Sequence, residues 1–169
     1  MKSMSIIVPP AHFYFNPRIL QPLMELHFAT IIEDNLNDID VDIVDLRGLR
    51  KKDFDSVIKR KDLLFYWIDR SGDYKYLQSF IKKYRKLYSK SIHVAGGVHI
   101  DVFGETCLDT FDIIIKGPGE RSIIDILSNK TNSQKVFIDS YSEVHYGDYG
   151  FAKRHFLPKD MVANKMKFL

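Results

Sequence analysis

Short, mostly apolar segments alternate with helix-like segments along most of this chain. The stretch from Leu63 to Ile68 is apolar at each position, which is typical of a strand that helices cover on both faces. Together with similar runs it predicts five strands, near residues 4–9, 41–46, 62–68, 91–95 and 111–116. Strands of this kind form parallel sheets, because right-handed helical crossovers then bury both faces.

The segments between these runs carry helical signals. Asn16-Pro17 is a helix start, a weaker helix surrounds residues 54–60, and a short helix spans residues 120–127. We therefore predict an α/β fold: a flavodoxin-like (Rossmann-like), doubly wound parallel sheet of five strands in the order 2-1-3-4-5, with helices on both faces. Residues 136–138 are a candidate for one more edge strand. The clearest helix has an apolar stripe of Leu77, Phe80, Ile81, Tyr84 and Leu87.

Composition narrows the classes of function. A chain of 169 residues fits one domain, and its net charge of +3 is too small to indicate a nucleic-acid partner. Cys107 is the single cysteine, which excludes an intrachain disulfide, a thiolate zinc site and an iron–sulfur cluster held by this chain alone. No apolar run is long enough to cross a membrane and the first residues lack a secretory signal, so we expect a cytoplasmic protein.

The chain divides into two regions. Residues 1–140 contain the alternating strands and helices of the α/β domain. Residues 141–169 have aromatic side chains, scattered charge and weak periodicity, so we interpret them as a carboxyl-terminal extension or linker. We expect this extension to add little to the sheet and to be partly mobile unless a partner covers it.

The predicted strand order places a ligand crevice at the carboxyl ends of the strands. Two glycine features fall there. Gly96-Gly97 ends the fourth strand, where the lack of a Cβ lets a ligand approach the backbone or simply allows a tight turn. Gly117-Pro118-Gly119 leads from the fifth strand into a helix whose first N–H groups face the same crevice. This segment, too, could instead be a tight turn with no role in ligand binding.

Several ligand classes that use this architecture fit the loops poorly. The loop from Pro9 to Phe15 has no Ser or Thr, although flavodoxins hold the flavin phosphate with hydroxyl groups there. A receiver domain needs paired acids after the first strand, where this chain has prolines, although Asp69 follows the third strand. A dinucleotide site needs G-x-G-x-x-G after the first strand, but the G-x-G of this chain follows the fifth, and Ser122 replaces the third glycine.

The two glycine features together with their spacing are more specific. Gly96-Gly97-Val98-His99 precedes the run from Phe111 to Glu120, F-D-I-I-I-K-G-P-G-E, which leads into a short helix. Over about residues 4–128 this pattern resembles the amino-terminal cobalamin-binding domain of cobalamin-dependent radical S-adenosylmethionine enzymes. The V-D-I-V-D-L run of residues 41–46 and the prolines after the first strand also resemble that family.

The resemblance implies a corrinoid that packs on the carboxyl edge of the sheet. Many cobalamin carriers have D-x-H-x-x-G after the first strand, with the histidine on cobalt; here Pro10 and Phe15 stand at the Asp and Gly positions around His12. The S-x-L element after the third strand is replaced by Ser71-Gly72-Asp73. The implied cofactor-binding residues are Pro10, His12, Ser71, Gly96, Gly97, His99, Gly117, Gly119 and Glu120.

The resulting hypothesis is a cobalamin-binding-type domain that acts by binding, with a corrinoid and a radical S-adenosylmethionine barrel or another protein as partners. It lacks the cysteines of the iron–sulfur barrel and contains no complete catalytic apparatus. A cofactor-free interaction or regulatory module on the same fold is the alternative. A third interpretation is a small transferase or hydrolase that uses His99 and Glu120.

Overall fold

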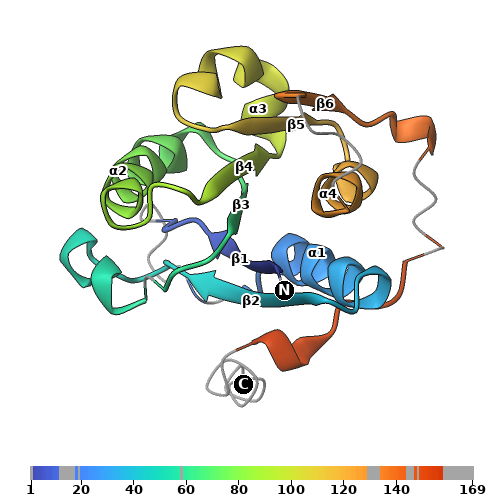
Figure 1. The fold of residues 1–169 in the computed structure, drawn as a ribbon, viewed down its shortest axis with the longest axis horizontal. Helices are drawn as coiled ribbons and strands as arrows, with labels where there is room; N and C mark the ends of the chain where they lie inside the picture. Colours follow the sequence, from blue (N-terminus) through green and yellow to red (C-terminus); the bar gives the residue numbers. More distant parts are fainter. Residues whose placement is uncertain are drawn as a thin grey trace.

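A six-stranded, wholly parallel sheet forms the centre of the molecule (Figure 1). The computed structural model describes residues 2–11, 18, 20–57, 59–128, 134–143, 147 and 149–157. The spatial order of the strands is β2-β1-β3-β4-β5-β6. The strands are β1 (Lys2–Val8), β2 (Ile39–Asp45), β3 (Leu63–Trp67), β4 (Ile92–Gly96), β5 (Ile113–Lys116) and β6 (Val136–Ile138).

This order confirms the expected 2-1-3-4-5 arrangement and corrects the number of strands. The run Val136-Phe137-Ile138 pairs with β5 as a sixth strand, so the sheet does not end at five. Three residues are too few to show a period, which is why the sequence indicated only a candidate edge strand there. β6 matters for the site, because it brings Asp139 beside the loop that follows β5.

Helices cover both faces of the sheet, with α1 and α4 on one face and α2 on the other (Figure 1). The weak helix expected near residues 54–60 is a 3-10 helix, and Asn16-Pro17 lies outside the described residues. In the described part, α1 begins directly after Pro22. The α-helices are α1 (Leu23–Asn35), α2 (Ser71–Leu87), α3 (Val98–Phe103) and α4 (Glu120–Leu127), and the 3-10 helices are η1 (Lys51–Ser56), η2 (Gly104–Asp109), η3 (Tyr141–Glu143) and η5 (Arg154–Phe156).

The central strand β3 divides the core into two clusters. Leu64 and Tyr66 point to the α2 face, whereas Phe65 and Trp67 point to the α1 and α4 face. All five residues of β3 are buried, as its continuous apolar sequence predicted. Phe28 of α1 is fully buried and packs against β3, with ring centroids 4.9 Å from Phe65 and 4.8 Å from Trp67. This aromatic cluster fixes α1 over the middle of the sheet.

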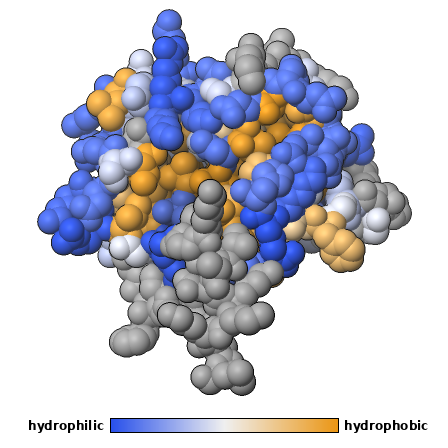
Figure 2. Space-filling view, turned by 90° about the horizontal axis from the view of Figure 1, so that it is seen from below, coloured by the Kyte–Doolittle hydropathy of each residue, from blue (hydrophilic) through white to orange (hydrophobic). Residues whose placement is uncertain are grey.

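The outer edge of the sheet is β2, which faces the viewer in Figure 2. A band of apolar residues crosses that face between hydrophilic ones (Figure 2). Asp40 and Asp42 alternate with the apolar residues of the strand, and charges on an edge strand oppose pairing with another sheet. The half-buried apolar residues of β2 are Ile39, Val41, Ile43 and Val44.

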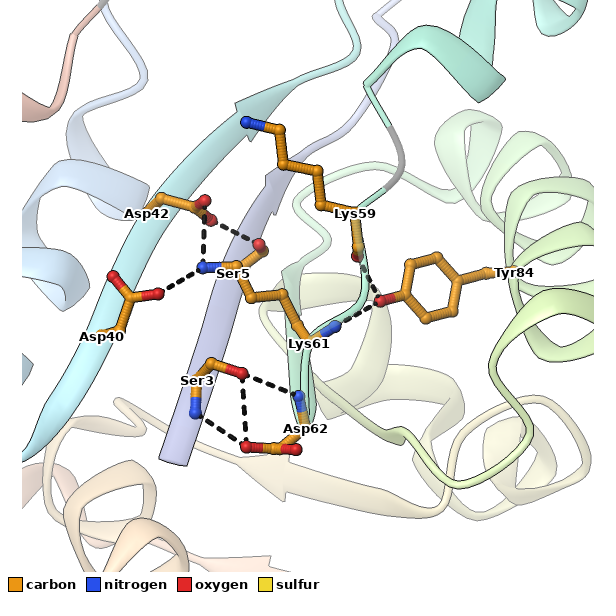
Figure 3. A network of polar contacts seen from close by, with 8 residues as sticks. All are labelled: Ser3, Ser5, Asp40, Asp42, Lys59, Lys61, Asp62 and Tyr84. Atoms are coloured by element: carbon orange, nitrogen blue, oxygen red, sulfur yellow. Dashed lines mark hydrogen bonds and ion pairs between the residues drawn. The ribbon is translucent and has the colours of Figure 1, made fainter. Parts of the chain in front are cut away.

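A lysine at the amino end of β3 neutralises these edge carboxylates (Figure 3). Lys61 Nζ lies 2.9 Å from Asp40 and 3.1 Å from Asp42, and its side chain is 8% exposed. Burial lowers the pKa of Lys61, but the hydrogen bonds to the two aspartates outweigh it, so the pKa is raised. The backbone N–H of Lys61 donates to the Tyr84 hydroxyl, which donates to the carbonyl of Lys59 (Figure 3). The network therefore ties β2, β3 and α2 together at the end of the sheet opposite the crevice.

The described part of the carboxyl-terminal extension folds back against α1. The backbone N–H of Lys153 donates to Thr30 Oγ1 at 2.8 Å, and its ammonium pairs with Glu33 and Asp34. His155 Nε2 lies 3.0 Å from Glu33 Oε1. Residues 149–157 thus make specific contacts with the domain, while the mobility expected for the extension stays a prediction, as does its separation from residues 1–140.

Replacing Phe28 with Ala should lower the free energy of unfolding by about 3–5 kcal/mol, because it leaves a cavity between α1 and β3. Urea denaturation followed by circular dichroism measures this loss. Leu23→Ala is the matched control on the same helix: its side chain is 58% exposed and its loss should change stability by less than about 1 kcal/mol. Equal effects of the two substitutions would contradict the packing described.

Candidate functional site

The carboxyl ends of the strands form the edge at which the predicted site residues gather. The chain leaves β1 for the outer strand β2 and then returns to β3 on the other side of β1. The two crossovers therefore diverge between β1 and β3, which is the topological switch point of the sheet. Pro10 is buried in the loop after β1. His12, expected in the same loop, lies outside the described residues.

A cavity of about 120 Å³ opens at this switch point. Its walls include Val8 and Trp67, the last residues of β1 and β3. Its volume is well below the roughly 300–1,000 Å³ of pockets that enclose a drug-sized ligand, so it accommodates a small group or one substituent of a larger molecule. The charged residues that line it are Glu25, Arg47, Asp69, Arg70 and Asp73.

Glu25, in the first turn of α1, is the most perturbed acid of the cavity. It is 7% exposed, and burial raises the pKa of its carboxyl from 4.5 to about 7. Its own backbone N–H and Arg47 oppose this shift, while Asp69 and Asp45 add to it. A carboxyl group with this pKa exchanges a proton near neutral pH and can donate or accept a hydrogen bond.

The guanidinium group of Arg47 bonds to neighbouring groups of the protein. Its Nε and Nη2 each donate to Asp45 at 2.9 Å, and Nη1 donates to the carbonyl of Leu20 at 2.6 Å. Arg18 Nε lies 3.7 Å from the same aspartate. These contacts neutralise Asp45 and join the carboxyl end of β2 to the chain before α1, so they close one side of the cavity.

The aspartates on the other side of the cavity position two loops. Asp73 of α2 accepts a hydrogen bond from the backbone N–H of Ala11 at 3.0 Å. Ala11 has φ of 50°, a conformation that non-glycine residues rarely adopt, so this bond holds the loop after β1 in a strained shape. The indole N–H of Trp67 donates to Asp69, and burial raises the pKa of that carboxyl.

Ser71 and His99 meet at the edge, as two of the predicted site residues. Ser71 is the first residue of α2 and is exposed, and His99 in α3 is buried. Ser71 Oγ lies 2.9 Å from His99 Nδ1, and Cys107 Sγ lies 3.8 Å from His99 Nε2. Burial lowers the pKa of His99, so the imidazole is neutral at pH 7.

Gly96 and Gly97 face the protein's own chain rather than open space. A Cβ at Gly96 would lie 3.0 Å from Trp67 Cζ3. Gly97 has φ of +97°, and a Cβ there would lie 2.8 Å from Ile68 N and 2.9 Å from Ile68 O. The loops after β3 and β4 pack backbone to backbone here, because Ile68 N–H donates to Gly96 O and His99 N–H donates to Ile68 O.

The second glycine pair serves the same kind of packing. Gly117 has φ of +90°, and the carbonyl oxygen of Asp139 occupies the direction of its missing Cβ. Gly119 has φ of +89°, and a Cβ there would lie 3.3 Å from Trp67 and 3.4 Å from Phe28. Each glycine therefore lets another segment approach closely, which gives it a structural role independent of any ligand.

Glu120, the last predicted site residue, is an almost fully buried acid at the start of α4. Its side chain is 1% exposed, and Oε1 lies 3.2 Å from His27 Nε2. Among the described residues, Oε2 has no hydrogen-bond partner. The contact between Glu120 and His27 joins α4 to α1, the two helices that cover one face of the sheet.

Sequence reasoning missed Glu25 and Arg47 as site residues. Glu25 stands among apolar residues at the start of a helix, where an acid is ordinarily explained by the helix dipole. Arg47 follows β2, which the strand order places beside β1, and that position in the sequence was the signal that could have found it.

Among the described residues, no group of three or more His, Cys, Asp and Glu side chains is arranged to hold a metal ion, and no helix is long and apolar enough to span a membrane.

Gly97→Ala should lower the free energy of unfolding by about 2 kcal/mol or more, because the new Cβ meets the Ile68 backbone at a positive φ. Gly147→Ala is the matched control, because no atom of the described residues lies within 4 Å of its Cβ position. Urea denaturation of both variants measures the difference. A Gly97→Ala protein as stable as the control would refute the close packing of the two loops.

Glu25→Gln should change the pH dependence of stability. The folded protein binds a proton at Glu25 more tightly than the unfolded chain, so this carboxyl stabilises the fold below pH 4.5 and loses that contribution as the pH rises to about 7. The loss is on the order of 3 kcal/mol. The variant should therefore gain stability over the parent between pH 5 and 8, as measured by urea midpoints at fixed salt. A constant difference across this range would show that Glu25 is not protonated by burial.

Comparisons with known proteins place the fold. No protein-family model matches this chain, and no curated protein gives a significant match. Among solved structures, the chain is similar to the cobalamin-dependent S-adenosylmethionine radical enzyme OxsB with aqua-cobalamin bound, at a TM-score of 0.59 and 14% identity. The match covers 78% of this chain and 19% of that enzyme. This chain therefore shares its fold with about a fifth of a cobalamin-dependent radical enzyme.

Proposed function

We propose that this chain is a corrinoid-binding-type domain that offers the carboxyl edge of its sheet as one face of a cofactor site. The observation that carries the proposal is the position of the family-like motifs. Gly96-Gly97-Val98-His99 and Gly117-Pro118-Gly119-Glu120 both fall at that edge, in a fold similar to part of an enzyme solved with aqua-cobalamin bound. The fold likeness supports a corrinoid as the ligand, and the sequence resemblance supports this edge as its position.

The geometry of the edge fits a one-sided site. The switch-point cavity of about 120 Å³ is too small to enclose a corrin ring, and the missing side chains of the glycines are replaced by the protein's own groups. The ring would therefore lie on the edge and not within it. Val98, Val102 and Phe103 of α3 offer an apolar surface for it, with exposed fractions of 57%, 67% and 48%.

Polar groups beside this surface suit the amide substituents of a corrinoid. The Ser71 and His99 pair and the protonatable carboxyl of Glu25 can each donate or accept a hydrogen bond. When bound, the corrinoid would supply cobalt chemistry that no side chain provides. A second protein layer, such as a radical S-adenosylmethionine barrel, would cover the exposed face of the ring, which agrees with the 19% share of the similar enzyme that this chain spans.

A cofactor-free interaction module is the second candidate, favoured by the same exposed residues of α3. Apolar side chains that cluster on a surface mark protein contacts as well as ligand contacts. Under that hypothesis the α3 surface would contact a protein directly. Binding of cobalamin by the isolated chain distinguishes the two functions.

The isolated protein should retain hydroxocobalamin through desalting or equilibrium dialysis, detected by visible absorbance. Val98→Lys should weaken this retention about tenfold or more, because a long cationic side chain then stands on the surface where the ring packs. Leu87→Lys is the matched control: Leu87 has the same 57% exposure but lies at the end of α2, at the opposite edge of the sheet.

Thermal unfolding of both variants shows whether either substitution disturbs the fold. Absence of cobalamin binding to the parent protein at about 100 µM cofactor would overturn the proposal and favour the interaction module. Equal retention by the two lysine variants would place the corrinoid away from α3.

A further inference from the structure

Ser71 has the surroundings of an activated hydroxyl group. It is exposed to solvent at the first position of the 17-residue helix α2, and its Oγ lies 2.9 Å from Nδ1 of His99. A serine hydroxyl is a weak nucleophile unless a neighbouring base accepts its proton. The 2.9 Å separation lies within the range over which a general base acts.

His99 is held in the orientation that this role requires. His99 is 7% exposed, and its ring packs against the rings of Tyr74, at 4.7 Å, and Phe103, at 5.0 Å. The ring has therefore little freedom to turn away from Ser71. Burial lowers its pKa, so the ring is in the neutral form that accepts a proton at pH 7.

The second ring nitrogen contacts a thiol group. A neutral imidazole has one N–H donor and one acceptor. Nε2 lies 3.8 Å from Sγ of the buried Cys107, and a thiol can act as a weak donor to this nitrogen or as a weak acceptor of its hydrogen. With the hydrogen on Nε2, Nδ1 is free to accept the hydroxyl hydrogen of Ser71. Cys107 thus occupies the place that a carboxylate takes in a Ser-His-Asp triad, although it orients the ring more weakly.

The helix adds an electrostatic contribution at Ser71. The amino terminus of α2 carries a partial positive charge and N–H groups that its own turn does not use. Negative charge that develops beside Ser71 during an attack is therefore stabilised. The nucleophile, its base and the positive end of a helix meet at one exposed position.

We propose that Ser71 is a base-activated nucleophile that accepts an acyl group from an activated ester. Ser71 Oγ forms a bond to the acyl carbon, the bond from that carbon to the leaving alcohol oxygen breaks, and the hydroxyl proton passes to His99 Nδ1 and then to the leaving group. The product is an ester on Ser71. This inference goes beyond corrinoid binding and does not rest on it, because it needs only the geometry of Ser71, His99 and Cys107.

The test uses p-nitrophenyl acetate with the intact chain at pH 7.5. We expect release of about one p-nitrophenolate per chain and an acetyl group on Ser71, located by peptide mass spectrometry. Ser79 is an internal comparison in the same molecule: it is also exposed on α2, but within the described part of the chain its Oγ hydrogen-bonds only with the carbonyl of Lys75 and the Lys51 ammonium. Ser71 should be acetylated at least about a hundredfold faster than Ser79, in line with the contribution of a general base.

Three variants assign the chemistry. Ser71→Ala should abolish the stoichiometric release, whereas Ser79→Ala should leave it unchanged. His99→Gln, with Ser71 intact, should slow acetylation of Ser71 about a hundredfold. Acetylation of Ser71 no faster than of Ser79 in the unmutated protein would overturn the proposal, whatever the stability of the variants. Undiminished acetylation in a folded His99→Gln protein would also overturn it.

Discussion

The indole of Trp67 determines how the carboxyl edge of the sheet is built. It ends the central strand β3 and fills the space that side chains at positions 96 and 119 would need. The ring of Phe28 in α1 packs against the Trp67 ring at a centroid distance of 4.8 Å, and the indole N–H of Trp67 donates to the carboxyl group of Asp69. Because the Trp67 ring lies against both Gly96 and Gly119, a substitution at either glycine disturbs the same cluster that anchors α1 to the sheet.

This arrangement changes how the glycine motifs are understood. From the sequence, a glycine at the end of a buried strand indicates either close approach of a ligand or a local turn. The structure adds a further explanation, in which the missing Cβ admits a side chain or backbone segment of the same chain. Positive φ at positions 97, 117 and 119 would require glycine even without any ligand. The glycine motifs therefore stabilise the fold directly. They support cofactor binding only indirectly, because they shape the edge of the sheet on which a cofactor would lie.

The sequence predicted the parallel sheet, its central order and both covered faces, because strands buried on both sides have a continuous apolar pattern that few other structures share. It also predicted that Ser71 and His99 lie at the same edge. It indicated the sixth strand, which has three residues, only as a candidate outside the five predicted strands, and it did not predict the buried state of Glu25. Both depend on tertiary contacts: β6 exists through its pairing with β5, and Glu25 is perturbed by residues from β2 and the β3 loop.

Charge is distributed differently at the two ends of the sheet. At the amino end, Lys61 is paired with two aspartates and its ammonium is fully compensated. At the carboxyl end, Glu25 and Asp69 share a small cavity and burial raises the pKa of both. A buried acid that is costly to ionise, such as Glu25, contributes nothing to folding at neutral pH that an apolar side chain would not supply better. Glu25 and Asp69 line the cavity at the switch point, on the same carboxyl edge of the sheet at which we place the proposed corrinoid site and the proposed reactive serine.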